Sequence, residues 1–114
     1  MSISPEHDIR LLYVTAESHT QALMLARRLV ELDLVACANI LGEISSVYKW
    51  NGAVTESTEV ALLLKTTKDM VDTVVATVRE LHSYECPCTI SVSVDGGDRD
   101  FMSWVVNAIS KKTV

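Results

Sequence analysis

Three segments of this chain are apolar at consecutive positions, and this feature constrains the fold more than any other. Each segment is short and rich in aliphatic residues, as strands are: Leu11–Val14, Val35–Leu41 and Ala61–Lys65. A strand that is apolar on both faces is covered on both faces in the folded protein. The rest of the 114-residue chain contains too few further elements to form both covers. We therefore expect another subunit to cover one face of the sheet, so that the protein self-associates.

The spacing of apolar and polar residues predicts the element order β-α-β-β-α-β, followed by a C-terminal helix. This order is typical of the split β-α-β or ferredoxin-like arrangement, an α+β fold with helices on one face of an antiparallel sheet. We expect an extended hairpin around Asn51-Gly52, whose second arm begins several residues after the turn. A single domain should span residues 1–114, with about residues 1–8 disordered or poorly ordered. The expected strands are 8–16, 35–41, 45–50, 57–66 and 89–95, and the expected helices are 18–34, 68–82 and a last one through 101–108.

Polar residues mark where these helices should begin. Ser18 and Gln21 have the spacing of a capping box, in which each residue satisfies a backbone N–H group of the first turn. Thr66 or Thr67 is the expected cap of the second helix, and Asp98 is the expected cap of the last one.

Composition excludes several classes of protein. The formal net charge is −5 and basic residues occur in runs no longer than two, so we expect no nucleic-acid partner. No apolar stretch approaches the roughly 20 residues that span a bilayer, and the N-terminal segment does not resemble a signal peptide. The cysteine count of 3 is odd, which is typical of a reduced protein, and we expect a cytoplasmic location without a membrane partner.

The segment His82–Cys88 combines an imidazole with two thiols. Soft thiolates and imidazole are ligands for copper or zinc, so His82, Cys86 and Cys88 are candidate ligands for copper or another divalent cation. The C-P-C spacing is tighter than that of known structural zinc sites, and His82 lies on the apolar stripe of its helix. The alternative, which these two observations favour, is a packed histidine followed by the entry to the last strand. The third cysteine, Cys37, is expected in the core and has no evident partner base for catalysis.

A second set of candidate residues is expected at a subunit interface or in a cleft between subunits. Tyr48 and Trp50 share one face of a hairpin arm, and large aromatic residues of this kind anchor interfaces. Glu59 and Lys65 lie on one strand, too far apart to pair with each other within it. The remaining two members of this set are Tyr84 and Trp104.

Five segments in order along the chain resemble motifs of the CutA family, the divalent-cation tolerance proteins. The similarity extends from about Leu12 to Trp104. In family notation these motifs include Y-x-W-x-G, E-x-x-L-x-L-K-T and L-H-P-Y-E-x-P. The matching segments are Leu34–Ile40, Ser46–Val54, Glu59–Thr66, Leu81–Pro87 and Gly97–Val105.

The resemblance implies a ferredoxin-like fold assembled into a tight homotrimer, and a role in tolerance of copper and other divalent cations. It implies no reaction, and it links mammalian relatives to the anchoring of a membrane cholinesterase. Bacterial members credited with copper binding use a cysteine at the end of the first strand and adjacent histidines at the end of the second helix. The matching positions here are Val14, Leu81 and His82, so only one of the family's three ligands is present. Cys88 stands where the family has glutamate.

The sequence thus predicts a non-enzymatic homotrimer associated with metal-ion tolerance, with no catalytic residue and no required cofactor. One alternative is a sensor or signal-coupling trimer that binds a small molecule in clefts between subunits, by analogy with PII-type regulators. A second alternative is a scaffold without any ligand. A further partner protein, not identified by the sequence, is compatible with each of these.

Overall fold

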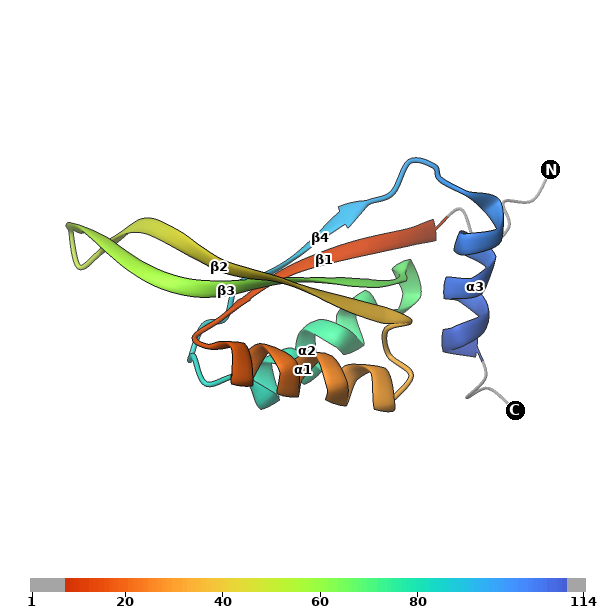
Figure 1. The fold of residues 1–114 in the computed structure, drawn as a ribbon, viewed down its shortest axis with the longest axis horizontal. Coiled ribbons are helices and arrows are strands. Elements are labelled where there is room, and N and C mark those ends of the chain that lie inside the picture. Colours follow the sequence, from red (N-terminus) through yellow and green to blue (C-terminus); the bar gives the residue numbers. More distant parts are fainter. Residues whose placement is uncertain (1–7, 111–114) are drawn as a thin grey trace.

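The computed structural model describes residues 8–110, and it confirms the predicted fold class and order of elements. The expectation of disorder in about residues 1–8 lies, apart from Asp8, outside the described residues. No helix within residues 8–110 is long and apolar enough to cross a membrane. The elements are β1 (Ile9–Ala16), α1 (His19–Glu31), β2 (Cys37–Trp50), β3 (Ala53–Thr67), the 3-10 turn η2 (Lys68–Met70), α2 (Val71–Leu81), β4 (Thr89–Ser93) and α3 (Arg99–Ser110) (Figure 1).

The four strands form one antiparallel sheet in the order β2-β3-β1-β4. Because β3 lies between β1 and β2, the first three strands form the split β-α-β arrangement that the sequence predicts. Helices α1 and α2 lie together on one face of the sheet, and α3 lies at the end of the sheet (Figure 1).

The main core lies between the sheet and helices α1 and α2. Alternate residues of β1 and β3 point toward the helices, as the period of two in a strand requires. Each large aliphatic side chain buried there contributes about 1.5–3 kcal/mol to stability. A smaller apolar cluster, formed by Ile9, Ala36, Val105 and Ile109, packs α3 against the end of the sheet. The main core includes Leu12, Val14, Leu25, Leu29, Leu62, Leu64, Val74 and Val78.

The hairpin of β2 and β3 is longer and more regular than predicted. Strand β3 begins at Ala53, directly after the turn, and not several residues later. Asn51 and Gly52 have positive φ angles of 52° and 81°, as in the two-residue turns that join antiparallel strands tightly. Residues 53–59 of β3 pair only with β2, so the hairpin projects beyond the rest of the sheet. The molecule is consequently elongated, with extents of 51 × 26 × 22 Å (Figure 1).

Two of the three predicted helix caps are confirmed. Ser18 Oγ accepts a hydrogen bond from the Gln21 N–H at 3.1 Å, and Asp98 Oδ2 accepts one from the Phe101 N–H at 2.9 Å. The Gln21 side chain does not complete a capping box, because its amide donates to the Leu81 carbonyl at 3.4 Å.

The threonine cap predicted for the second helix is present in position only: Thr67 is the N-cap residue of η2, but its side chain makes no capping hydrogen bond. Thr66 Oγ1 donates to the Leu34 carbonyl, and Thr67 Oγ1 donates to Asp69. Neither hydroxyl accepts a hydrogen bond from a helix N–H group, and the N-cap residue of α2 itself is Met70, at the end of η2.

The second face of the sheet is apolar and uncovered in the single chain. On this face Tyr13 lies opposite Ile90 on one side and Leu63 on the other, and Leu11 lies opposite Val92. Ile90 is 56% exposed and Val92 is 51% exposed. The sheet is therefore apolar on both faces, as the sequence predicts, and one of these faces is open to solvent.

Candidate functional site

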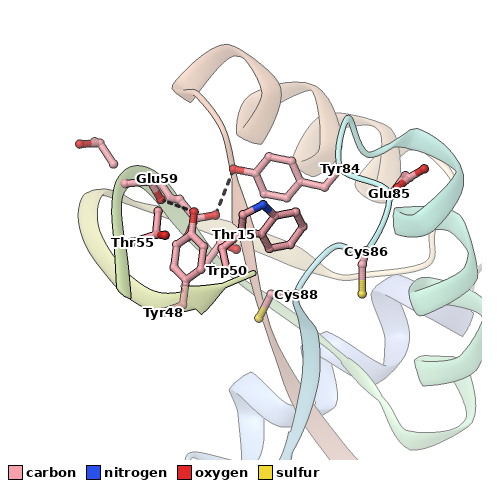
Figure 2. Close-up of a pocket in the computed structure, with 11 residues that line it drawn as sticks. Thr15, Tyr48, Trp50, Thr55, Glu59, Tyr84, Glu85, Cys86 and Cys88 are labelled. Atoms are coloured by element: carbon pink, nitrogen blue, oxygen red, sulfur yellow. Dashed lines mark hydrogen bonds between the residues drawn. The ribbon is translucent and has the colours of Figure 1, made fainter. Parts of the chain in front are cut away.

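The projecting hairpin and the loop between α2 and β4 line an open cavity of about 560 Å³ (Figure 2). This volume lies within the range of pockets that bind small molecules. The lining comes from three strands and one loop, which are brought together by the sheet order. The residues are Thr15, Tyr48, Trp50, Thr55, Ser57, Thr58, Glu59, Tyr84, Glu85, Cys86 and Cys88.

Glu59 and Tyr84 are paired inside this cavity. The Tyr84 hydroxyl donates to Glu59 Oε2 at 3.0 Å (Figure 2). Burial, this hydrogen bond and the negative charge of Glu59 together raise the pKa of Tyr84 to about 12. The phenol is therefore a neutral hydrogen-bond donor throughout the physiological range, and the pair presents one carboxylate to the cavity.

His82 fixes the loop that carries Tyr84. Its side chain is buried, and Nε2 lies 2.7 Å from the Thr15 carbonyl oxygen. Its Nδ1 accepts a hydrogen bond from the Tyr84 N–H at 3.0 Å, so the ring proton must lie on Nε2 and is donated to Thr15. The rings of His82 and Tyr84 are 4.6 Å apart between centroids. Both ring nitrogens of His82 are thus engaged in positioning the loop against β1.

The predicted metal ligands His82, Cys86 and Cys88 are not brought together as a set. Both thiols are free and exposed and line the cavity, whereas the His82 ring is directed to Thr15. Burial and the negative charge of Glu59 raise the pKa of the Cys88 thiol, which disfavours the thiolate form that metals bind. No group of three or more His, Cys, Asp or Glu side chains within residues 8–110 is arranged to hold a metal ion. The metal site stays a prediction.

Cys37 is half-buried at the start of β2 and is not in the core. The expectation for this residue fails because Cys37 lies opposite Lys65, on the face of the sheet that nothing within residues 8–110 covers fully. It takes no part in the cavity.

Four of the six residues predicted for an interface or cleft line the cavity: Tyr48, Trp50, Glu59 and Tyr84. The Tyr48 hydroxyl donates to Ser57 Oγ on the neighbouring strand at 3.2 Å, which holds the ring in place. Trp50 is 66% exposed, so a large apolar surface faces the cavity and solvent.

The other two predicted residues, Lys65 on β3 and Trp104 on α3, lie outside the cavity. The Lys65 ammonium lies 5.4 Å from the centre of the Phe101 ring, and Phe101 stacks on Trp104 at 5.7 Å. Sequence reasoning missed the hydroxyl residues of the lining: Thr15, Thr55, Ser57 and Thr58. The sequence indicates only two of them: Thr55 and Ser57 share a face of β3 with Glu59, because side chains alternate between the two faces of a strand.

Comparisons with known proteins agree with this fold. The family model described as CutA1 divalent ion tolerance protein matches residues 10–108. A CutA homolog from Xenopus laevis is 40% identical over 93 residues, which cover 82% of this chain and 62% of that protein. The structure of the divalent ion tolerance protein CutA1 from Ehrlichia chaffeensis has a TM-score of 0.86 and 34% identity, covering 90% of this chain and 96% of that one. A structure described as the periplasmic divalent cation tolerance protein CutA from Archaeoglobus fulgidus has a TM-score of 0.86 and 33% identity, covering 89% and 98%.

The chain spans 62% of the Xenopus relative and 52% of the mouse and human CutA proteins. It nevertheless covers nearly the whole length of the Ehrlichia and Archaeoglobus structures. The family description names a tolerance protein and no enzyme. Since the family model matches most of the chain and the fold agrees throughout, this chain belongs to the CutA1 divalent ion tolerance family.

Proposed function

We propose that this protein is a homotrimer that acts in tolerance of divalent metal ions without catalysing a reaction. Family membership supports the association with metal tolerance. The main observation in favour of a homotrimer is the apolar sheet face around Ile90 and Val92, which the single chain leaves exposed. Burial of such a face contributes about 25 cal/mol for each Å² of apolar surface removed from water.

The projecting hairpin supports the same assembly. Isolated two-stranded hairpins are marginally stable in water, and this one carries exposed apolar residues along both arms. Val47 and Val54, on the face of the hairpin opposite Tyr48 and Trp50, are 65% and 71% exposed. Contact with neighbouring copies would cover these side chains and the unpaired edges of the hairpin. In a closed ring of three copies, every subunit makes the same contacts, so the exposed apolar surface is covered in each of them.

Sedimentation velocity tests the assembly directly. We expect a single species of three times the chain mass at micromolar concentration. A stable monomer at that concentration would contradict the proposal, because the open sheet face would then be exposed in solution.

Metal binding, where it occurs, would use the thiols of Cys86 and Cys88, which are the free soft donors beside the cavity. His82 is a poor third ligand because both of its ring nitrogens are occupied. The fold itself requires no cofactor. Calorimetry in reducing buffer should show weak binding of Cu(I) or Zn²⁺ that is lost in the double variant Cys86→Ser, Cys88→Ser. Cys37→Ser is the matched control, and equal binding by the double variant and the wild type would contradict a thiol site.

The cavity favours a second candidate function, that of a small-molecule sensor or signal-coupling trimer. In a ligand-free scaffold we expect Glu59 and Tyr84 to be paired with each other inside a dry interface. They are paired here, but they line an open space of about 560 Å³. Space of this kind beside a hairpin that reaches toward neighbouring copies is suited to a ligand at a subunit boundary. A binding screen of metals and metabolites on the reduced trimer tests this function, and a trimer that binds nothing would support the ligand-free scaffold.

We also propose a cytoplasmic location, without a nucleic-acid or membrane partner. The two exposed free thiols suit a reducing compartment, and the net charge of −5 disfavours contact with phosphate backbones. Subcellular fractionation tests the location; recovery in an oxidising compartment would contradict it. An additional partner protein would be detected by cross-linking in the native host.

A further inference from the structure

We propose that the cavity binds a small organic cation, with its ammonium group held between the aromatic rings of Tyr48, Trp50 and Tyr84 and the carboxylate of Glu59. This inference rests on the second candidate function, the ligand-binding trimer, and names the chemical class of its ligand. It does not depend on the role in metal tolerance.

The charge of the lining excludes anionic ligands. None of the lining residues in the described part of the chain carries a positive charge, and Glu59 and Glu85 are both acidic. The Glu85 side chain points away from the other lining residues, so Glu59 is the charge that faces the cavity (Figure 2). An anion placed here would lose its water beside a carboxylate and gain no compensating partner.

The Glu59 carboxylate is oriented and keeps capacity for a ligand. Tyr84 donates to Oε2, and the structure gives Oε1 no hydrogen-bond partner within residues 8–110. Glu59 is thus the one lining carboxylate directed into the cavity, and a monovalent organic cation would match its charge.

The aromatic side chains select an organic cation in preference to a metal ion. Aromatic rings attract ammonium groups over their faces, and tryptophan does so most strongly. Trp50 and Tyr48 are 66% and 42% exposed, so their faces are accessible from the cavity and solvent. A metal ion would need several ligating side chains, and no such group exists within residues 8–110. An ammonium ion needs only one carboxylate and the ring faces.

Calorimetry on the full-length trimer tests this inference with choline as the probe. Its neutral isostere, 3,3-dimethylbutan-1-ol, has the same shape without the charge, and inorganic phosphate serves as the anionic probe. We expect choline to bind with a dissociation constant on the order of 1 mM or tighter. The neutral isostere should bind at least about tenfold more weakly, and phosphate should not bind.

A matched pair of variants locates the binding. Glu59→Gln and Glu56→Gln each remove one carboxylate from β3, but Glu56 does not line the cavity. We expect Glu59→Gln to weaken choline binding roughly tenfold and Glu56→Gln to leave it unchanged. Sedimentation of each variant confirms that the trimer is intact, and the comparison of choline with its isostere needs no variant at all.

Three results would overturn the inference: equal affinity for choline and its isostere, equal loss of binding in both variants, or no binding of choline. If phosphate or another anion binds instead, the organic-cation inference fails while the ligand-binding trimer stands. If a side chain from a neighbouring copy fills the cavity and no probe binds, both fail together.

Discussion

The hydroxyl of Thr66 shows how a single buried polar atom joins distant parts of this fold. Thr66 is fully buried on β3, and its Oγ1 donates to the Leu34 carbonyl at 2.7 Å. Leu34 lies in the segment that leads from α1 into β2. The bond therefore links the end of the first β-α unit to the centre of the sheet, and a buried carbonyl without this partner would be unsatisfied.

Thr66→Val should destabilise the protein by about 1–3 kcal/mol, because valine keeps the shape of threonine and leaves the Leu34 carbonyl unpaired. Chemical denaturation at fixed protein concentration measures this change. Thr77→Val is the matched control, since the Thr77 hydroxyl also donates to a carbonyl, that of Thr73, but on the exposed face of α2. An equal loss of unfolding free energy in both variants would show that the buried hydrogen bond stabilises the protein no more than the exposed one.

The Tyr84–Glu59 pair predicts a dependence on pH at the alkaline end. The pKa of Tyr84 is about 12 in the folded chain, against a usual value of 10.0. Between these values the unfolded chain has lost the phenol proton while the folded chain keeps it. The stability contributed by the neutral phenol is therefore complete below about pH 10 and is lost as the pH rises toward 12.

Absorbance titration of the phenolate should show that one of the 3 tyrosines ionises last, near pH 12. Tyr84→Phe should remove this late step, and Glu59→Gln should lower the pKa of Tyr84 by removing the neighbouring charge. Ionisation of all tyrosines together near pH 10 would contradict the burial and pairing of Tyr84.

At the scale of elements, the hairpin of β2 and β3 depends on its two-residue turn. Both turn residues have positive φ, which favours asparagine and glycine at these positions. A register shift between Ile40 and Gly42, where Leu41 is the extra residue, separates the part of β2 inside the sheet from the projecting arm. The turn and this register shift together set the direction in which Tyr48 and Trp50 face.

Gly52→Ala should destabilise the protein by about 1 kcal/mol, because alanine at φ +81° is strained. Gly96→Ala is the control, since its φ is not left-handed and an added Cβ meets nothing within 4 Å. Thermal unfolding of the two variants side by side measures the difference. Equal midpoints would show that the turn is not held in the left-handed conformation.

At the scale of the whole molecule, the proposed assembly depends on the open sheet face. Ile90 and Val92 on β4 lie beside Tyr13 and Leu11 on β1, so their exposed side chains continue an apolar surface across two strands. Apolar surfaces of this kind mark sites of protein association. In a monomer the same exposed apolar surface would promote aggregation.

Ile90→Asp should dissociate the proposed trimer, weakening association by about 3 kcal/mol or more, because it buries an unpaired charge in the proposed interface. Leu23→Asp places the same charge on another exposed aliphatic residue, on α1 away from the sheet, and should leave the trimer intact. Sedimentation at several concentrations distinguishes the two variants. Dissociation by both, or by neither, would place the interface elsewhere.

The sequence by itself determined the order of elements, the two-sided apolar strands, the Asn51-Gly52 turn and the caps at Ser18 and Asp98. Each of these is a local property, encoded by the periodicity of side chains or by the conformation of one or two residues. It also selected Glu59 and Tyr84 as candidate residues, but as separate ones.

Only the tertiary structure decided which of these residues meet. Glu59 and Tyr84 are 25 positions apart, and His82 and Thr15 are 67 apart, so their contacts depend on the strand order and register of the whole sheet. The fold also directed the His82 ring to the Thr15 carbonyl of β1, which spacing along the chain could not show. Local patterns specify elements, whereas a site made by several strands exists only once the sheet has placed them side by side.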